Sequence, residues 1–322
     1  MLYKEYSNCR LCPRNCGVNR HSGETGACGE IEHLRVAAIE AHFGEEPPIS
    51  GIHGSGTVFF TGCSLKCRYC QNYQISHEGV GRPMSVCDVV DRLEQLIRQQ
   101  YIHNINFVTA DHFFPHTIDI VQQHAERGLR IPVVYNLSGY QSIASLQMIE
   151  SCADIYLPDF KYSDADIASQ LSQCWDYPTI AIEAIAEMVR QKGFLNSVDK
   201  MDKGNALASK GVLLRHLILP GQVKNSLDAL TMLFIEFGPD LPLSLMSQYC
   251  PTRQFVQPYL NRCVTSNEFR EVYSHAQELG FNHLFVQFPD ETEMERPFLP
   301  DFQRQKPFMG NIQPGNNQSK KS

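Results

Sequence analysis

Apolar residues in this chain gather in short runs, separated by longer stretches of mixed apolar and polar residues. Each clear run is rich in β-branched or aromatic residues, as buried strands are. Strands separated by helix-length stretches are typical of βαβ units and therefore of a parallel sheet. The clear runs lie at residues 57–61, 105–109, 132–137, 154–158 and 212–219, and two weaker ones lie at 243–247 and 283–288.

Three of the stretches in between have the periodicity of helices. Residues 86–100 are the clearest case, because apolar residues recur at steps of three and four after Ser85, a good N-terminal cap. Residues 227–237 and 266–279 are predicted helices that each end at a glycine. Their expected caps are Asn225 or Ser226 for the first and Ser266 or Asn267 for the second.

About six strands with crossover helices are too few for a closed eight-stranded barrel. We therefore expect an α/β fold, a partial (β/α)6 barrel, over residues 51–296. A cysteine-rich, metal-binding leader is expected at residues 1–50. The tail at residues 297–322 is rich in Pro, Gly, Asn and Gln, and we expect it to be disordered.

The composition excludes several classes of protein. Lys and Arg number 28 against 35 Asp and Glu, a net charge of −7, and no basic stripe is present, so we expect no nucleic-acid partner. The N-terminus lacks the apolar core of a signal peptide and no run reaches the roughly 18 apolar residues of a span, so we expect no membrane partner. A cytoplasmic location follows, where the 12 cysteines serve as metal ligands or buried thiols.

Three cysteines in one loop, Cys63, Cys67 and Cys70, are the strongest chemical signal. They follow the first predicted strand with the spacing Cys-x3-Cys-x2-Cys, and no fourth cysteine lies nearby. A four-iron cluster takes one thiolate per iron, so three cysteines leave one iron open to another ligand. The alternative interpretation is a zinc loop or three structural thiols.

Four further cysteines, Cys9, Cys12, Cys16 and Cys28, are spaced Cys-x2-Cys-x3-Cys-x11-Cys within the leader. Neighbouring glycines permit tight turns, so four thiolates can close round one metal site. Zinc is the first interpretation, a second iron–sulfur cluster is the alternative, and unligated thiols are the third. The other cysteines are expected to be buried small residues: Cys87, Cys152, Cys174, Cys250 and Cys263.

Polar residues follow the predicted strands, where ligands of barrel-like α/β folds bind. Hydroxyl and amide groups suit a ribose, a carboxylate suits an ammonium group, and a lysine or arginine suits a carboxylate. Neighbours in a strand face opposite sides, so of Arg215 and His216 we expect Arg215 to face the ligand; His112 is a candidate acid–base group. The candidate ligand-binding residues are Thr109, Asp111, Asn136, Ser138, Asp159, Lys161 and Arg215.

The cysteine loop, with Tyr69 in its aromatic slot, resembles that of the radical S-adenosylmethionine (SAM) superfamily. The stretches NINFVTADH, YNLSGY, YLPDFKY, RHLILPG and LMSQYCP resemble one subgroup of it, the proteins similar to pyruvate formate-lyase activating enzyme. The leader is similar to a CxLCPxxC segment found on related proteins. The resemblance implies the same partial barrel, a [4Fe–4S] cluster on the three loop cysteines, and SAM on the fourth iron with Tyr69 beside it.

Single residues match the glycyl-radical-enzyme activases within this superfamily. Asp159 and Lys161 match their Asp-x-Lys pair, which implies that Lys161 contacts the SAM carboxylate. Ser138 matches a hydroxyl ahead of a glycine. Their Gly-Gly-Glu loop is absent, and Thr109 and Asp111 stand in its place as substitutes.

The resemblance also implies reductive cleavage of SAM to a 5′-deoxyadenosyl radical that abstracts a hydrogen atom. A reduced flavodoxin or ferredoxin would donate the electron, and a glycyl radical enzyme would be the partner that receives the radical. Modification of a small molecule or peptide is the rival reaction, and a lid that includes Tyr249, Arg253 and Tyr259 would favour it. A non-catalytic iron–sulfur protein for electron transfer or sensing is the third alternative.

Overall fold

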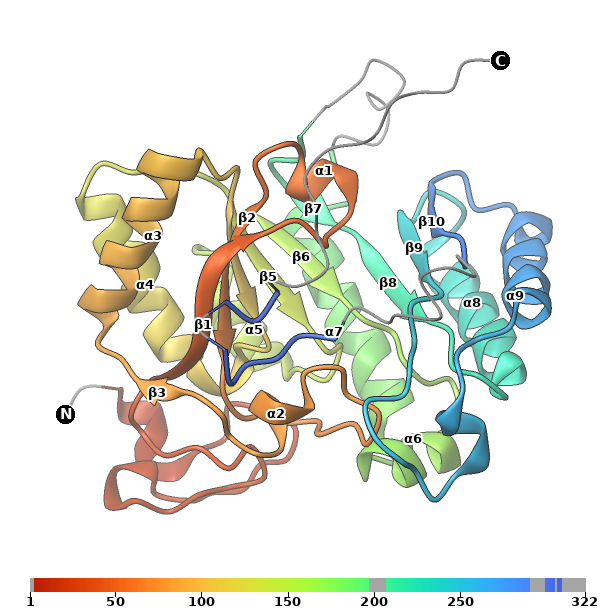
Figure 1. Ribbon diagram of the computed structural model, residues 1–322, viewed down its shortest axis with the longest axis horizontal. Coiled ribbons are helices and arrows are strands. Elements are labelled where there is room, and N and C mark those ends of the chain that lie inside the picture. The colour runs from red at the N-terminus through yellow and green to blue at the C-terminus, as the bar shows by residue number, and fades with distance from the viewer. Residues whose placement is uncertain (1–2, 197–206, 290–298, 305, 309–322) are drawn as a thin grey trace.

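The apolar runs form the parallel strands that the sequence predicts, and these strands follow one another round a curved array (Figure 1). The computed structural model describes residues 3–196, 207–289, 299–304 and 306–308. The parallel strands are β2 (Ser55–Phe60), β4 (Ile105–Val108), β5 (Val133–Leu137), β6 (Ile155–Pro158), β7 (Gly211–Val212), β8 (Leu214–Leu217), β9 (Leu243–Met246) and β10 (Leu284–Gln287).

Two sheets make up the array. The larger has the order β3-β1-β2-β4-β5-β6-β7 and the smaller the order β10-β9-β8. The predicted strand 212–219 is divided at Leu213, so one stretch of chain serves both sheets. The sheets stay adjacent because Arg215 of β8 pairs in parallel with Asp159, and the Phe160 nitrogen donates to the Arg215 oxygen over 2.8 Å. Among the described residues no backbone pairing joins β10 back to β1 or β3, so this α/β fold is an open, partial barrel.

Two antiparallel strands extend the larger sheet beyond the parallel ones. β1 (Arg35–His42) pairs with β2, and β3 (Arg82–Pro83) pairs with β1. β1 lies within the stretch 1–50 that the sequence assigns to the leader, and the residues before it form the cysteine-rich segment. Most side chains of β1 are half-buried on both faces, so its sequence lacks the alternation that predicts a strand.

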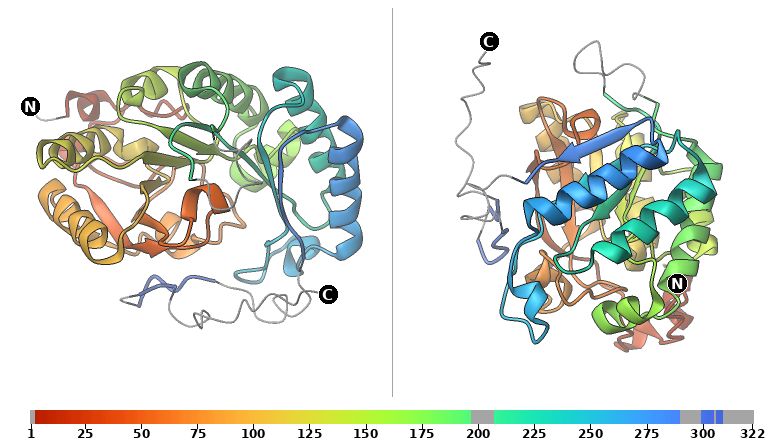
Figure 2. Two further views of the ribbon diagram at one scale, coloured as in Figure 1. Left: turned by 90° about the horizontal axis from the view of Figure 1, so that it is seen from above. Right: turned by 90° about the vertical axis from the view of Figure 1, so that its right-hand side faces the viewer.

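The longer helices lie along the outer side of the array (Figure 2). None of the helices in the described ranges has the length and apolar character to cross a bilayer. The α-helices are α1 (Pro47–Ser50), α2 (Tyr73–Ser76), α3 (Val86–Gln100), α4 (Phe114–Glu126), α5 (Ile143–Ile149), α6 (Ala165–Ser172), α7 (Tyr177–Lys192), α8 (Val223–Phe237) and α9 (Ser266–Leu279). Short 3-10 turns are η1 (Lys4–Asn8), η2 (Arg20–Ser22), η3 (Asp111–Phe113) and η5 (Pro258–Asn261).

All three predicted helices are confirmed, with differences at two of the caps. Ser85 caps α3 in a capping box, as predicted, whereas α9 is capped by Thr265, one residue earlier than expected. The expected caps of α8 were wrong, because α8 starts before them and both lie inside its first turn. Their side chains bond across the fold: Asn225 to the Ser163 nitrogen and Ser226 to His216.

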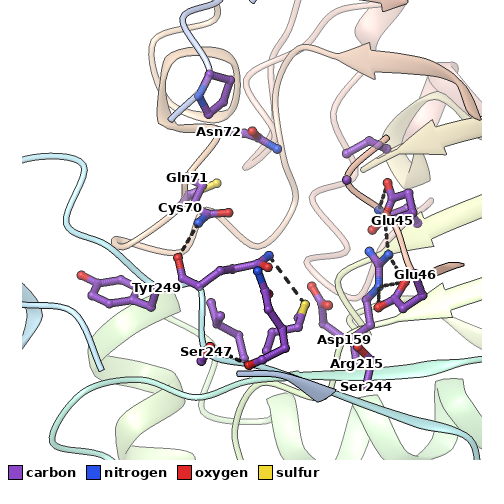
Figure 3. A pocket seen from close by; sticks show the side chains of 18 of the residues that line it. Glu45, Glu46, Cys70, Gln71, Asn72, Asp159, Arg215, Ser244, Ser247 and Tyr249 are labelled. Atoms are coloured by element: carbon purple, nitrogen blue, oxygen red, sulfur yellow. Dashed lines mark hydrogen bonds and ion pairs between the residues drawn. The ribbon is translucent and has the colours of Figure 1, made fainter. Parts of the chain in front are cut away.

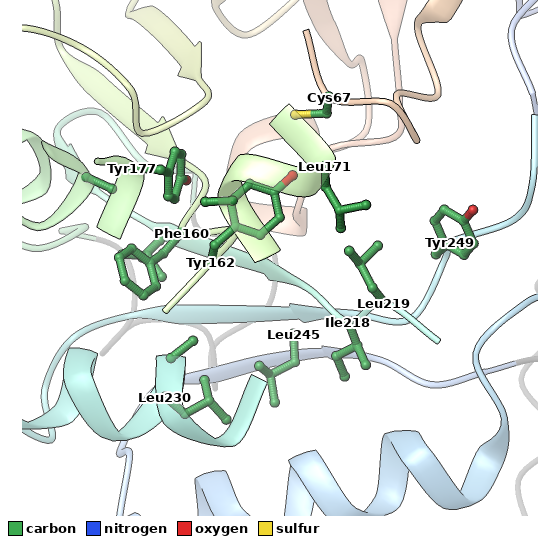
Figure 4. Packing of buried hydrophobic residues seen from close by; sticks show 14 of the residues in the cluster. Cys67, Phe160, Tyr162, Leu171, Tyr177, Ile218, Leu219, Leu230, Leu245 and Tyr249 are labelled. Carbon is green, nitrogen blue, oxygen red and sulfur yellow. The ribbon is translucent and has the colours of Figure 1, made fainter. Parts of the chain in front are cut away.

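The cysteine loop after β2 is packed on the core of the molecule. Figure 4 shows Cys67 beside Leu171 and Tyr162, above Ile218, which directly follows β8, and Leu230 of α8. All of these side chains are buried. The loop therefore rests on a packed surface, and close packing of this kind resists displacement.

Residues 299–304 and 306–308, which we call the cover segment, lie across the open side of the barrel (Figure 2). Phe302 is 5% exposed and packs on Phe59 of β2, with 5.4 Å between the ring centroids. This stretch belongs to the tail expected to be disordered, and aromatic packing holds it in place despite its polar composition. The rest of that tail, 297–298, 305 and 309–322, lies outside the described residues.

Candidate active site

The cysteine loop, residues 63–70, presents its three cysteines to one cavity. Cys63 and Cys67 are each 7% exposed, and Cys70 is half-buried. The Lys66 nitrogen donates to Cys63 Sγ over 3.4 Å, and hydrogen bonds to sulfur are among the contacts that tune iron–sulfur clusters. Three thiols that face one cavity fit a [4Fe–4S] cluster with one iron left open.

Without metal, Cys63 and Cys70 hold their protons. Burial raises the pKa of Cys63 well above its usual value, and the charges of Asp111, Cys67 and Cys70 raise it further. Burial also raises the pKa of Cys70. Because iron binds thiolates, cluster assembly must displace these protons.

A cavity of about 1180 Å³ connects the loop with the interior of the barrel (Figure 3). Its volume exceeds the roughly 300–1,000 Å³ of common small-molecule sites, so it has room for SAM and for a second small molecule. The predicted residues that line it are Tyr69, Thr109, Asn136, Ser138, Asp159, Lys161 and Arg215.

Asp159 and Lys161, just after β6, form an ion pair in the cavity wall. Lys161 Nζ lies 2.5 Å from Asp159 Oδ2. Burial lowers the pKa of Lys161, but the charges of Asp159 and Cys67 raise it by more, so this lysine stays charged. Asn225 of α8 fixes the segment by donating to the Lys161 oxygen over 3.1 Å. The pair offers one carboxylate and one ammonium side by side beneath the cysteine loop.

Tyr177, the first residue of α7, joins the ends of β5 and β6. Its hydroxyl accepts from the Lys161 nitrogen over 2.9 Å and lies 2.8 Å from the Ser138 oxygen, to which it donates. Gly139 sits below it with φ +79°, and a Cβ there would stand 2.2 Å from the Asp159 oxygen. A glycine is therefore required at this position, because any side chain would separate the two strand ends.

Arg215 points to the cavity floor, where two carboxylates neutralise it. Its guanidinium pairs with Glu45 and, at 2.5 Å, with Glu46 (Figure 3). Asn136 and Asn106 also donate to Glu45 Oε1. Burial raises the pKa of Glu45, but Arg215 lowers it by more. Arg215 is thus committed to a buried network and is not a free cation for a ligand.

Thr109 and Asp111 are separated by the structure. Thr109 lines the cavity with φ +54°, a left-handed backbone that costs a β-branched residue of order 1–3 kcal/mol. Glycine adopts that conformation freely, so Thr109 stands at a position where a glycine would carry no strain. Asp111 lies in η3, fully buried and outside the cavity lining. The turn carries its carboxylate toward the leader.

The candidate histidines are structural. His112 Nε2 bonds to the Thr61 oxygen over 2.7 Å, and burial lowers its pKa to about 3. His216 bonds the Phe160 oxygen and Ser226 Oγ. Neither lines the cavity, so the expectation that Arg215 faces it and His216 does not is confirmed.

Sequence reasoning missed several lining residues. Glu45 and Glu46 come from the connection after β1, a strand that was not predicted. Cys250 and Cys263 were expected to be inert core residues, yet both line the cavity, and Cys263 is only half-buried. Cys87 is exposed beside Arg127. No sequence pattern indicates that Cys250 and Cys263 line the same cavity, because 12 residues separate them along the chain.

A model of the Radical SAM superfamily matches residues 57–233, more than half of the chain. The chain belongs to the radical SAM superfamily. An uncharacterized protein of Methanocaldococcus jannaschii is 25% identical over 295 residues, which are 87% of this chain and 77% of that protein.

Solved radical SAM structures are similar at lower identity. A cysteine-to-serine mutant of spore photoproduct lyase aligns with 78% of this chain and 79% of its own, at a TM-score of 0.47 and 12% identity. SuiB of Streptococcus suis bound to S-adenosylmethionine aligns with 73% of this chain, at a TM-score of 0.46 and 10% identity. This chain spans 50% of the SuiB chain.

Membership of the radical SAM superfamily indicates which cofactors the cavity binds. Radical SAM enzymes use a [4Fe–4S] cluster and SAM, and the matched region contains the cysteine loop and the polar strand ends that line the cavity. The loop cysteines supply three thiolates, and the ion pair after β6 supplies the two charges that a free amino acid group needs. The residues that line the cavity therefore fit both the [4Fe–4S] cluster and SAM.

Proposed function

We propose that this radical SAM enzyme binds its cluster at Cys63, Cys67 and Cys70 and abstracts a hydrogen atom from a small molecule or short peptide enclosed in the cavity. The observation that carries the substrate class is that two segments reach over part of that cavity's opening. When bound, the cluster and SAM supply a 5′-deoxyadenosyl radical; the chain binds, orients and shields it.

The ion pair after β6 would orient SAM. The Lys161 ammonium suits the methionyl carboxylate and the Asp159 carboxylate suits the methionyl ammonium, since charge-assisted bonds are the strong ones. Ser138, Asn136 and Thr109 offer hydroxyl and amide groups to the ribose. Tyr69, 4% exposed, lies between the cysteines and the tyrosines that support the loop.

Two segments cover the cavity. The cover segment contributes Pro300 and Phe308 to its lining, and the Phe302 nitrogen donates to Gln74 Oε1 over 2.7 Å, which ties the segment to α2. The loop after β9 contributes Tyr249. Enclosure excludes water from a radical, and it also narrows the path by which a folded protein could insert a loop.

The loop after β9 is tied directly to the cysteine loop. Arg253 donates to the Arg68 oxygen over 3.1 Å, and its guanidinium lies 4.0 Å from the centre of the Tyr73 ring. Gln71 donates to the Gln248 oxygen over 3.2 Å. A lid of this kind was the feature expected to favour a small substrate.

Activation of a glycyl radical enzyme is the second candidate, supported by the matches at Asp159, Lys161 and Ser138 and by the stretches that resemble the activating-enzyme subgroup. It would require the cover segment or the loop after β9 to move aside for a protein loop. A reduced flavodoxin or ferredoxin remains the proposed electron donor for either reaction. A non-catalytic role in electron transfer or sensing does not explain why the chain has a ligand-sized cavity beside the cysteine loop.

The test separates the two substrate classes. The anaerobically reconstituted enzyme is given SAM, a reductant, and either the small-molecule filtrate or the protein retentate of a cell extract. We expect the filtrate to stimulate 5′-deoxyadenosine formation, measured by mass spectrometry. Stimulation by the retentate alone, with a glycyl radical signal in electron paramagnetic resonance (EPR), would overturn the proposal in favour of activase function.

A further inference from the structure

The proposed reaction leaves four cysteines of the leader unused, although the fold gathers them. Turns bring them together: the Cys9 nitrogen donates to the Val18 oxygen over 2.9 Å, and the Ala27 nitrogen donates to Cys16 Sγ over 3.3 Å. The Gly17 nitrogen also donates to the Cys9 oxygen over 2.9 Å. These bonds bring the segments that carry Cys9, Cys16 and Cys28 side by side, and Cys12 lies on the turn between the first two.

A buried cation accompanies these thiols. Arg20 is 0% exposed, and its guanidinium donates to the Ile31 oxygen, to the His112 oxygen over 2.6 Å, and toward Cys9 Sγ at 4.0 Å. It also lies 4.0 Å from the centre of the Tyr6 ring. No ion pair among the described residues includes Arg20. The buried Glu30 carboxylate lies within electrostatic range of Arg20, and metal-bound thiolates would add negative charge beside this buried cation.

The leader touches the cysteine loop of the cavity. The Cys63 nitrogen donates to the Cys28 oxygen over 3.4 Å. Gly62 has no room for a side chain, because a Cβ there would lie 2.8 Å from the same Cys28 oxygen. Arg14 spans the junction by donating to the Ser64 oxygen over 3.0 Å. Cys28 of the leader thus contacts a ligand of the cavity site, while Cys16 is exposed.

A carboxylate without a partner lies at the same junction. Asp111 is 0% exposed, and neither of its oxygens makes a hydrogen bond of normal geometry, although Ser64 lies beside it. The charge of Asp111 raises the pKa of Cys12 and Cys28 in the leader and the pKa of Cys63 in the cysteine loop. Buried carboxylates without a hydrogen-bond partner are rare, and this one lies where the leader meets the cysteine loop.

We propose that Cys9, Cys12, Cys16 and Cys28 bind a second [4Fe–4S] cluster, which accepts electrons at the surface and passes them to the site at Cys63, Cys67 and Cys70. Four thiolates satisfy the four irons. The contact of Cys28 with Cys63 favours a cluster over zinc at the leader, because zinc has no redox chemistry and a cluster beside the cavity site can carry an electron to it.

The electron balance is simple. A reduced flavodoxin or ferredoxin would lose one electron at the exposed Cys16 side, and the leader cluster would gain it. The leader cluster would then return to its oxidised form by giving that electron to the cavity site through the contact of Cys28 with Cys63. The electron-transfer role of the leader cluster rests on the proposed function. The presence of a cluster in the leader does not.

The first test counts iron in full-length protein reconstituted anaerobically with iron and sulfide. A variant with Cys63, Cys67 and Cys70 changed to Ala is expected to keep about half of the wild-type iron and sulfide and, when reduced, an EPR signal of a [4Fe–4S] cluster. The complementary variant with Cys12 and Cys16 changed to Ala is expected to lose the other half. One zinc per chain in the first variant, or no metal in it with a native circular dichroism spectrum, would overturn the second cluster.

The second test compares reductants. In the Cys12 and Cys16 variant, we expect SAM cleavage driven by reduced flavodoxin to fall about tenfold or more relative to cleavage driven by dithionite, which is small enough to reach the cavity site directly. Equal losses with both reductants would overturn the electron-transfer role. Wild-type protein that holds both clusters but cleaves no SAM would instead contradict the proposed function.

Discussion

Lys161 extends from the end of β6 into the cavity, where its ammonium pairs with Asp159 and its backbone is held by Tyr177 and Asn225. The side chain is therefore placed before any ligand binds. Preorganisation of this kind reduces the entropic cost of binding. Among the charged groups of the cavity wall it differs from Arg215, which two carboxylates already neutralise.

Lys161→Met is predicted to weaken SAM binding by about tenfold to a hundredfold, the value of one charge-assisted hydrogen bond of about 1.5–3 kcal/mol. Iron content should not change, because the lysine holds no iron. Anaerobic equilibrium dialysis with SAM measures the effect. Lys192→Met is the matched control, since Lys192 bonds the Glu150 oxygen at the far end of α7. Equal SAM affinity in both variants would remove Lys161 from the binding site.

His216 predicts a pH dependence of stability. Its Nδ1 donates to the Phe160 oxygen, so Nε2 accepts from Ser226 Oγ, and burial lowers its pKa from 6.5 to about 4. As the pH falls from 6.5 to 4, His216 therefore binds a proton in the unfolded chain but not in the folded chain. Stability should fall by about 3 kcal/mol on acidification through that window.

His216→Gln keeps one donor and one acceptor at this position and does not titrate. Urea unfolding of the metal-free protein at several pH values should show a shallower decline for this variant between pH 6.5 and 4. Parallel declines in the variant and wild type would mean that other groups set the acid sensitivity.

Sequence predicted most of the site at the level of residues because strand ends of parallel sheets converge. Ser138, Asp159 and Lys161 were found in this way. Tyr177 was missed because it acts through its hydroxyl from the start of a helix that was not predicted. Asp111 was placed in the ligand site because it follows β4 closely, but the η3 turn directs it to the leader side.

At the scale of elements, the parallel strands were predictable because they are buried on both faces and read as continuous apolar runs. β1 was not, because half-buried side chains on an antiparallel strand give no clear period. α7 was missed although its buried residues recur at helical spacing, because alanines and a glutamate make up half of that buried stripe. The cover segment was missed because a few aromatic contacts hold it in an otherwise polar tail.

The cover segment is predicted to open locally without unfolding the barrel. Phe302→Ala should make its backbone amides exchange about tenfold faster or more, equivalent to about 1.4 kcal/mol or more of local stability, while the global unfolding midpoint changes little. Hydrogen exchange followed by mass spectrometry measures this. Phe288→Ala, at a position that is 62% exposed, is the control. A large fall in the global midpoint for Phe302→Ala would show that the segment is part of the core.

At the scale of the whole molecule, one face of the fold brings three features together. The leader lies against the cysteine loop, the cysteine loop opens on the cavity, and the cover segment and the loop after β9 enclose that cavity. These features lie in sequence from the exposed thiol of Cys16 to the interior of the cavity. In the proposed reaction an electron would enter at the exposed end, and SAM and the substrate would bind in the interior. The net charge of −7 is consistent with the absence of any nucleic-acid role in this account.

The most direct test of the central claim is the formation of 5′-deoxyadenosine from SAM. Wild-type protein and Cys67→Ala are reconstituted anaerobically with iron and sulfide, reduced with dithionite, and assayed by mass spectrometry. We predict product from the wild type and none above background from Cys67→Ala, because the cavity site needs all three thiolates. A wild-type protein with a full iron content that makes no 5′-deoxyadenosine, or a variant that makes as much as the wild type, would contradict the account.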